Sequence, residues 1–431
     1  MSKNKIKIYG FLLAILVLYS VESLNAQGFR VGTARRVITP DPLLPISGGV
    51  GAPNPAEIKK GEITARAIVF SDGQTTIGIA GLDLLGFPSV LGDRVRAKVP
   101  QIEGDNILIG ASHTHSAPDC YAFPLPSGGH TGDLDFMDFV CQQTADALNE
   151  AYRTLEPASL RVNTDVAAER IAYNYYAPAL YDRRMGVIQA IRADNSVIAT
   201  LVNYAIHPEV LGSDAGILSP DCIGPMYDRI EKSTGGNVVF MNGAQGGMVT
   251  ADNRDLGQLK DPVKAVWSDH RTWEECERIG QLMAEEALRI IQNAPTQKSP
   301  SISCRTARVK FPVDSAQMWA IIAGSPLQYP HDPADRSITT RISLARLGDA
   351  RILTVPGEAL PNIGFYLKRK MTSKNAMLFG LTNDAFGYIL TDVDFESFDR
   401  YSYVSRTSLG ERTGPILIRE ALKLIDADDK R

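Results

Sequence analysis

Short apolar runs recur along the chain, and each is bounded by turn-forming residues. Runs of this length, rich in β-branched and aliphatic side chains, are typical of buried strands. The runs that predict strands are Ala65–Phe70, Thr76–Ala80, Asn106–Ile109, Val197–Ala205, Val238–Met241, Arg351–Val355 and Ala376–Leu381.

Longer segments with apolar residues spaced three and four apart alternate with these runs and predict helices. They are Leu134–Leu155, Ile223–Ser233, Trp273–Asn293, Leu360–Met371 and a C-terminal segment near Gly414–Ile425. Gly235 and Gly236 follow the second of them, where a glycine cap is expected. The alternation of strands and helices predicts an α/β fold with a substantial parallel component.

The first residues have the order of a secretory signal peptide. Three lysines precede an apolar stretch from about Tyr9 to Val21, and Ala26 is the small residue at the expected cut. We therefore predict a signal peptide over residues 1–26 and a mature chain of residues 27–431, located in the periplasm or secreted. An uncleaved anchor is the alternative, although such segments are normally longer.

Composition narrows the possible partners. The chain is 44% hydrophobic and 22% charged, with a formal net charge of -4, as is ordinary for a globular protein. No basic stripe is present to meet phosphates, so we expect no nucleic-acid partner. Apart from the signal segment, no apolar run is long enough to cross a bilayer. The five cysteines show no CxxC spacing, which argues against a cysteine zinc site.

The six histidines are few enough for their positions to be informative. His113 and His115 directly follow the predicted strand Asn106–Ile109. If the extended conformation continues, both imidazoles point to one face at a strand's carboxyl end, where sites form in open α/β sheets. Neutral imidazole is a good zinc ligand, so this pair predicts a metal or catalytic role.

Other strand ends carry residues of the same chemical kind. His207 closes the run Val197–Ala205, and Glu358 follows Arg351–Val355 after a Pro-Gly turn. Tyr388 comes shortly after Ala376–Leu381. Each has a structural alternative: a hydrogen-bonding histidine, a carboxylate favoured by a helix dipole, and a surface or core tyrosine. Together, two nitrogens and a carboxylate oxygen suit zinc, with a further position left for water.

The ordered motifs around these residues resemble those of the neutral/alkaline non-lysosomal ceramidases. The matching blocks are Val31–Pro40, Leu82–Leu85, His113–Ser116, Asn203–Pro208, Ser219–Gly224, Phe240–Gly246, Pro356–Glu358 and Asn383–Tyr388. The resemblance implies an α/β fold with two mixed β-sheets that are flanked by helices, and a metal site at strand carboxyl ends. It implies a neutral ceramidase-like catalytic domain without a C-terminal immunoglobulin-like domain.

The resemblance also implies a role for each site residue. It makes His113, His207, Glu358 and Tyr388 the zinc ligands and His115 the general base that acts on zinc-bound water. Tyr401 is the nearest match to the tyrosine that stabilises the oxyanion, with Tyr403 one register shift away. The implied reaction is hydrolysis of the amide of ceramide to sphingosine and a fatty acid.

The sequence departs from the family pattern at several positions. Gly247 replaces an aspartate, Val249 a small polar residue, and Tyr175 an arginine. After the histidine pair, Ala117 and Asp119 stand where the family often has glycine. These changes leave the ligand set intact and bear on the substrate.

Two classes of function follow from this sequence. The first is an exported zinc-dependent amidohydrolase that attacks an N-acyl amide with zinc-bound water; its first candidate substrate is ceramide or a related lipid amide. A zinc hydrolase of another amide or of an ester is a variant of that class. The second is a non-catalytic exported protein that binds a lipid or small molecule on the same scaffold, which the missing carboxylate at Gly247 motivates.

Overall fold

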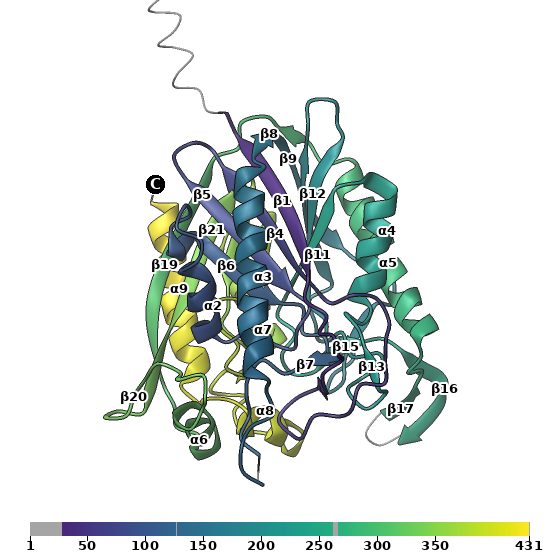
Figure 1. Cartoon of the computed structure of the whole chain (residues 1–431), viewed down its shortest axis with the longest axis vertical. Helices are drawn as coiled ribbons and strands as arrows, with labels where there is room; N and C mark the ends of the chain where they lie inside the picture. Colours follow the sequence, from purple (N-terminus) through teal and green to yellow (C-terminus); the bar gives the residue numbers. More distant parts are fainter. Residues whose placement is uncertain (1–27, 126, 262–265, 431) are drawn as a thin grey trace, which may run out of the picture.

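Three five-stranded sheets form the centre of the described part of the chain. A computed structural model describes residues 28–125, 127–261 and 266–430, so the predicted signal peptide lies outside the described residues. The prediction of mixed sheets flanked by helices is confirmed. The implied number of two sheets is wrong, because the chain forms three five-stranded sheets. Each of them is built by a separate third of the chain (Figure 1).

The strand order of the first sheet is β8 (Glu156–Pro157), β1 (Arg30–Val37), β4 (Thr64–Ser71), β5 (Thr76–Leu82) and β6 (Ile107–Ala111). Its neighbours pair antiparallel except β5 and β6, which are parallel. The chain crosses between those two strands through α2 (Ser89–Arg96). The longer helix α3 (Leu134–Arg153) then packs on β1 and β4.

The second sheet repeats this arrangement with β18 (Thr296–Gln297), β9 (Ser159–Val166), β11 (Arg184–Ile191), β12 (Val197–Tyr204) and β14 (Asn237–Asn242). Again only the last pair, β12 and β14, is parallel. Helix α4 (Ile223–Thr234) lies between these two strands in the sequence, and α5 (Trp273–Gln292) packs on β11 and β9.

The third sheet has the same order in β19 (Ile302–Pro312), β21 (Ser337–Leu347), β22 (Ala350–Thr354) and β24 (Asn375–Phe379), with β20 (His331–Asp332) added against β21. Here β22 and β24 form the parallel pair. Helix α7 (Pro361–Lys370) connects them, and α9 (Thr413–Asp429) packs on β19 and β21. Each third of the chain therefore supplies one parallel pair and one pair of helices.

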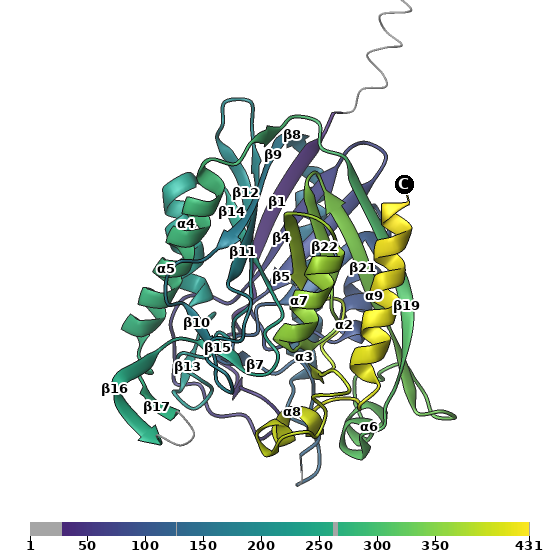
Figure 2. The same cartoon turned by 180° about the vertical axis from the view of Figure 1, so that it is seen from behind.

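The sheets face one another, and their helices lie outside. Residues of all three sheets share one central apolar cluster, including Phe70, Met241 and Phe379. Each sheet also has its own cluster beneath its helices, and together α3, the α4–α5 pair and the α7–α9 pair surround the sheets (Figures 1 and 2). Burying a face on each side in this way is how layered α/β folds gain apolar burial.

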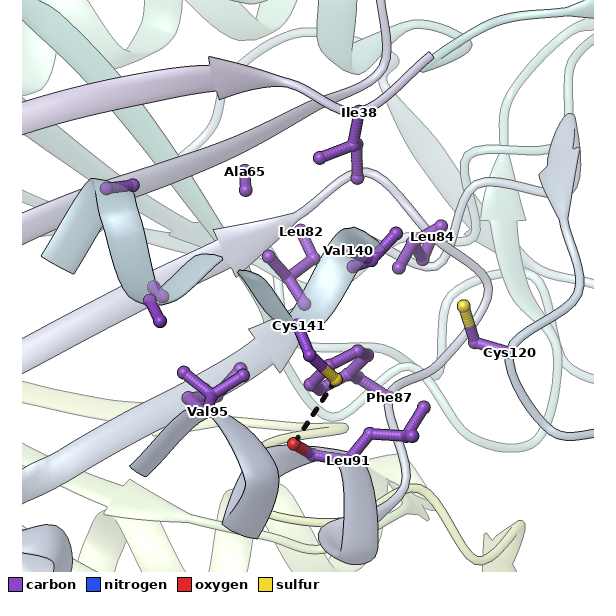
Figure 3. Close-up of a cluster of buried hydrophobic side chains, with 14 of the residues drawn as sticks. Ile38, Ala65, Leu82, Leu84, Phe87, Leu91, Val95, Cys120, Val140 and Cys141 are labelled. Carbon is purple, nitrogen blue, oxygen red and sulfur yellow. Dashed lines mark hydrogen bonds between the residues drawn. The ribbon is translucent and has the colours of Figure 1, made fainter. Parts of the chain in front are cut away.

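The cluster beneath α2 and α3 shows how this packing works. Figure 3 shows Leu82 and Ala65 of the sheet near Val140 and Cys141 of α3, with Phe87 and Leu91 close by. The Cys141 thiol donates to the Leu91 carbonyl over 3.6 Å and joins α3 to α2. All five cysteines are free thiols.

Short elements gather at one end of the molecule, the lower end in Figure 1. The strands of the two-stranded sheets are β2 (Ile46–Ser47), β3 (Ile58–Lys59), β7 (Ala117–Pro118), β10 (Ala172–Asn174), β13 (Ile217–Leu218), β15 (Val249–Ala251), β16 (Arg254–Asp261), β17 (Val266–Asp269), β23 (Glu358–Ala359) and β25 (Tyr388–Ile389). The short helices α6 (Ala316–Ala323) and α8 (Ser402–Arg406) lie there as well. The carboxyl ends of the three parallel pairs point to this end.

The helices and strands predicted from apolar periodicity are all confirmed within a few residues at their ends. The prediction missed the antiparallel strands β1, β9, β11, β19 and β21, several of which carry arginines or polar residues between apolar ones. Within the described ranges, no helix combines the length and apolarity needed to cross a bilayer.

Candidate metal centre

His113 reaches the site through a left-handed turn. Strand β6 ends at Ala111, and His113 has a φ of 73°, so the expectation that the strand continues through both histidines is wrong. Backbone bonds over-determine this conformation: Ser112 N donates to Leu82 O over 2.8 Å, and His113 N to Leu84 O over 2.9 Å. Strain of this kind costs about 1–3 kcal/mol and is typical of functional sites.

His113 and His207 are held in the same chemical form. The Nδ1–H of His113 donates to the Leu85 carbonyl over 2.6 Å, and the Nδ1–H of His207 donates to the Val249 carbonyl over 2.9 Å. His207 N also bonds Val249 O over 2.7 Å, which fixes the ring against β15. A histidine whose Nδ1 is bonded in this way presents Nε2 as its ligand atom.

Glu358 and Tyr388 sit opposite each other on two short parallel strands. In the pairing of β23 with β25, Glu358 and Tyr388 are partners, and Glu358 N donates to Gly387 O over 2.9 Å. Both side chains are buried, and the Tyr388 hydroxyl contacts Met248 Sδ at 3.3 Å. The predicted carboxylate and phenol are thus brought together by the ends of β22 and β24.

One carboxylate oxygen receives both ring nitrogens. Glu358 Oε2 lies 3.1 Å from His207 Nε2 and 3.4 Å from His113 Nε2. The two imidazole rings meet edge to face with centroids 4.6 Å apart. All predicted ligand residues therefore converge from three different sheets, with His113 from the first, His207 from the second, and Glu358 and Tyr388 from the third.

The electrostatics of the site follow from burial and from these contacts. Burial raises the pKa of Glu358, but the neighbouring His113 and His207 outweigh it and hold that pKa below its usual range. Burial lowers the pKa of His207, whereas the bond to Glu358 raises it above the ordinary value. The pKa of Tyr388 is raised well above the usual value, first by burial and then by the charge of Glu358.

The donor set fits a zinc ion. Because both Nδ1–H groups already donate to carbonyls, neutral rings would turn two nitrogen lone pairs toward one carboxylate oxygen. A cation among these acceptors removes that conflict, and two imidazole nitrogens with a carboxylate and a phenol oxygen form a mixed nitrogen and oxygen set of the kind that zinc takes. The ring nitrogens of His113, His115 and His207 lie within 4.8 Å of one another, so three imidazoles meet at this point.

His115 is built differently from the other two histidines. Its ring lies 4.9 Å from that of His113, and its Nε2 is buried without a hydrogen-bond partner among the described residues. Its Nδ1 lies 3.4 Å from Glu209 Oε2, a residue that sequence reasoning missed. Burial, followed by the charges of His113 and His207, lowers the pKa of His115 well below its ordinary value.

The two tyrosines near the predicted oxyanion position have different surroundings. Tyr401 packs its ring against Tyr176 and Phe398, with centroids 5.3 and 5.4 Å away, and it is not among the described residues that line the cavity. Tyr403 lines the cavity, with its ring 5.9 Å from that of Tyr388. Burial, with the charges of Glu358 and Glu209, raises the pKa of Tyr403 to about 12.

A pocket opens above these residues. His113, His115, Glu358 and Tyr388 form a polar part of its wall, and His207 lies fully buried. Much of the remaining wall is apolar or aromatic and comes from α6 and from distant loops. It includes Val50, Leu85, Tyr121, Phe123, Met318, Ile321, Ile322 and Phe386. The site is therefore a polar centre inside an otherwise apolar cavity.

Three departures from the family pattern that lie in the described part of the chain are Val249, Gly247 and Tyr175. Val249 supplies its carbonyl, not its side chain, to His207, so the loss of a polar side chain there leaves this bond in place. Gly247 has a φ of 70°, and a Cβ there would lie 3.1 Å from Leu360, so the turn is built for glycine. Tyr175, at the family's arginine position, is partly exposed beside Tyr176.

The fold defines this chain as a mixed α/β protein, and its predicted ligand residues His113, His207 and Glu358 lie together after strands of three different sheets. No protein-family model matches the chain, and no curated protein sequence is similar to it.

Solved structures are similar to it over nearly its whole length. The crystal structure of neutral ceramidase from Pseudomonas aeruginosa has a TM-score of 0.76 at 14% identity and covers 94% of this chain and 75% of its own. A ceramidase complexed with C2 has a TM-score of 0.75 at 15% identity and covers 94% of this chain and 76% of its own. The chain therefore has the neutral ceramidase fold, which confirms the resemblance at the level of the fold.

Proposed function

We propose that this chain is an exported, zinc-dependent hydrolase of an N-acyl amide, with ceramide or a related lipid amide as the first candidate substrate. The observation that carries the proposal is the convergence of His113, His207, Glu358 and Tyr388, from three sheets, on one point in the wall of an apolar cavity. The neutral ceramidase fold supports the choice of an amide bond.

The ligand residues would hold the ion through the two Nε2 atoms, the Glu358 carboxylate and the Tyr388 phenol. Zinc supplies Lewis acidity, which polarises a carbonyl and lowers the pKa of a water to about 7. The hydrogen bonds to the Leu85 and Val249 carbonyls keep both histidines oriented for this task.

The remaining polar residues have separate tasks. His115 has an unpartnered Nε2 and would take a proton from the attacking water and pass it to the leaving amine nitrogen. Tyr403 keeps its proton because its pKa is about 12, so it would donate a hydrogen bond to the carbonyl oxygen as negative charge develops. We assign the oxyanion role to Tyr403 in preference to Tyr401 because only Tyr403 is found in the cavity lining.

The shape and polarity of the cavity favour a lipid amide. An apolar wall from Met318, Ile321 and Ile322 of α6 would bury hydrocarbon, which stabilises binding by about 25 cal/mol per Å² of buried apolar surface. Export to the periplasm or outside the cell, as the first 26 residues predict, would place the enzyme where such lipids reach it.

A second candidate keeps the pocket and changes the chemistry. Tyr175 stands where the resemblance expects an arginine and Gly247 where it expects an aspartate, so two charges of the family pattern are absent. These differences favour a hydrolase of another amide or of an ester, or a protein that binds such a ligand without turnover.

The test is a substrate panel on the mature protein with measured zinc content. We expect about one zinc per chain and release of fatty acid from N-acyl amides, with long acyl chains preferred. Ester turnover alone would favour the second hydrolase. Stoichiometric binding without turnover at full zinc loading would favour the binding protein, and a protein that retains no zinc after zinc is supplied would contradict both hydrolases.

A further inference from the structure

One tyrosine hydroxyl in the cavity wall has no task in the proposed reaction. Tyr121 lines the cavity, and its hydroxyl has no hydrogen-bond partner within residues 28–125, 127–261 and 266–430. The other tyrosines of the wall are already accounted for. The hydroxyl of Tyr388 contacts a methionine sulfur, that of Tyr329 donates to a buried carboxylate, and Tyr403 is assigned the oxyanion role.

The Tyr121 hydroxyl lies against the backbone of Gly86. A Cβ on Gly86 would collide with this oxygen and with the ring carbon that carries it, so glycine is required for the phenol to fit. Gly86 directly follows Leu85, whose carbonyl accepts the Nδ1–H of His113. The hydroxyl therefore lies beside the segment that orients a predicted zinc ligand, on the side of the cavity that the first sheet provides.

The backbone that carries Tyr121 is folded into a tight turn. Asp119, which stands where the family often has glycine, accepts from Tyr121 N over 2.9 Å and from Ala122 N over 2.8 Å. The same carboxylate accepts from the Thr131 hydroxyl. Ala122 has a φ of 55°, and strain of this kind persists only where the surroundings hold it. The Asp119 carboxylate thus holds the turn that places Tyr121 in the cavity wall.

The residues on both sides of Tyr121 fix its ring. Cys120 is buried in the apolar cluster beneath α2 and α3 (Figure 3). Phe123 stacks on the Tyr121 ring, with centroids 4.7 Å apart and planes inclined by 18°. Because offset stacking of this kind favours one ring orientation, the hydroxyl is held at a set place in the wall.

The state of this hydroxyl suits it to bind a neutral polar group. Burial, followed by the charge of Glu358, raises the pKa of Tyr121 well above its usual value, so the hydroxyl keeps its proton. A phenol both donates and accepts a hydrogen bond. In cavities with largely apolar walls, a few placed polar groups of this kind set the orientation and the specificity of the ligand.

We propose that Tyr121 is a specificity-determining residue whose hydroxyl bonds a hydroxyl group that the substrate carries close to its scissile amide. This inference rests on the proposed function, because it narrows the substrate to hydroxylated N-acyl amides. A substrate hydroxyl fits because it can both accept from and donate to the phenol, and a neutral group enters an apolar cavity at a lower cost than an ion. It can belong to the amine part or to the acyl part of the amide.

Tyr121→Phe removes this oxygen and nothing else. Since the hydroxyl has no partner in the described protein, its loss takes no hydrogen bond from the fold, and the ring keeps its stack on Phe123. We therefore expect an unchanged midpoint of unfolding. Tyr329 provides the contrast, because its hydroxyl donates to Asp384 and its removal would take a bond from a buried carboxylate.

The experiment measures kcat/KM for three amides of matched size on the zinc-loaded mature protein. N-dodecanoylpropylamine has no hydroxyl, N-dodecanoylethanolamine has one on the amine part, and N-(α-hydroxydodecanoyl)propylamine has one on the acyl part. We expect wild type to prefer one of the two hydroxylated amides about tenfold, as for one neutral hydrogen bond. In Tyr121→Phe this preference should fall to within about twofold, because the partner of the substrate hydroxyl is gone.

A matched control uses a tyrosine outside the cavity. Tyr366 on α7 lies against Arg369 and Lys370 and is not among the described residues of the cavity wall. Tyr366→Phe should therefore keep both the wild-type kcat/KM and the wild-type preference among the three amides.

The outcomes separate this inference from the proposed function. The role of Tyr121 is overturned if wild type prefers neither hydroxylated amide, or if Tyr121→Phe keeps the preference. An equal loss of kcat for all three amides would also overturn it, since an oxyanion donor acts on every substrate. Absence of turnover in wild type would instead overturn the proposed function. The same amides are then compared by their dissociation constants in calorimetry, where loss of the preference in Tyr121→Phe would still support the role of Tyr121.

Discussion

The second and third sheets offer the site the same pair of parallel strand ends and use them differently. In the third sheet both ends lead to predicted ligand residues, Glu358 after β22 and Tyr388 after β24. In the second sheet only β12 does so, through His207, whereas β14 leads into the glycine-rich turn of residues 243–247. A Cβ on Gly246 would collide with the Glu358 carbonyl. The glycine turn after β14 thus provides the space in which Glu358, the predicted ligand after β22, lies.

The largest loss of activity is expected from a substitution after the third sheet. Glu358→Ala removes the carboxylate that both imidazoles face, so we expect hydrolysis to fall by at least about 10³-fold because the Lewis acid is worth several kcal/mol. Steady-state turnover measures this, with the exposed Glu411→Ala as a control. Retention of more than a tenth of wild-type turnover in Glu358→Ala would remove Glu358 from the ligand set.

Two tyrosines that follow the third sheet are expected to differ in their effect on kcat. Tyr403→Phe removes a hydroxyl from the cavity, and we expect kcat to fall about 10²-fold, as for the loss of one oxyanion donor. Tyr401→Phe removes a hydroxyl from a ring packed on Tyr176 and Phe398, and kcat should change less than about threefold. The reverse order of effects would restore Tyr401 to the oxyanion role.

A buried ion pair joins the two sheets. Lys368 Nζ on α7 lies 3.1 Å from Asp182 Oδ2 beside β11, and Arg184 also bonds this carboxylate. Burial raises the pKa of Asp182, but Lys368 and Arg184 lower it to about 2, below the value of about 3.9 in the unfolded chain. Its contribution to stability is therefore present above pH 4 and is lost as the pH falls toward 2.

Asp182→Asn tests this contribution. We expect the variant to be less stable at pH 7 by an amount on the order of 2–3 kcal/mol, with the gap narrowing between about pH 4 and pH 2. Urea unfolding at several pH values measures the gap. An equal gap at pH 7 and pH 3 would show that packing, and not the charge of Asp182, joins the sheets.

The smallest effect is expected from a substitution in the turn after β14 of the second sheet, which packs against the backbone of Glu358. Gly246→Ala places a methyl group against the Glu358 carbonyl, and we expect a loss of stability of about 1–3 kcal/mol together with weaker zinc binding. Gly51→Ala is the matched control, because no atom lies within 4 Å of its added Cβ. Equal zinc affinity in both variants would contradict the supporting role of the turn.

The sequence predicted the strands that form the buried parallel pairs, and the long helices, because their apolar patterns are continuous. It missed strands such as β19, whose residues Arg308 and Lys310 interrupt the apolar pattern on an exposed face. The repeat of one strand-and-helix order in three sheets also escaped notice, since pairing partners are set by contacts between distant segments and not by local pattern.

The predicted ligand residues are brought together in the structure, whereas the details that orient them could not be predicted. The left-handed turn at His113 depends on bonds to Leu82 and Leu84, which lie far away in the sequence. Glu209 is two residues from His207, so an H-x-E spacing was visible, but its contact with His115 depends on how two loops meet. Tyr401 ends a short 3-10 turn, whereas Tyr403 lies in the first turn of α8. Which of the two tyrosines reaches the cavity therefore depends on where α8 begins.

The most direct test of the central claim is a crystal structure of the zinc-loaded mature protein with anomalous data at the zinc edge. We expect one strong peak within about 2.0–2.3 Å of His113 Nε2, His207 Nε2 and a Glu358 oxygen, with Tyr388 next to it and His115 outside bonding distance. No peak at that position, or a peak bonded to His115 in place of Glu358, would contradict it.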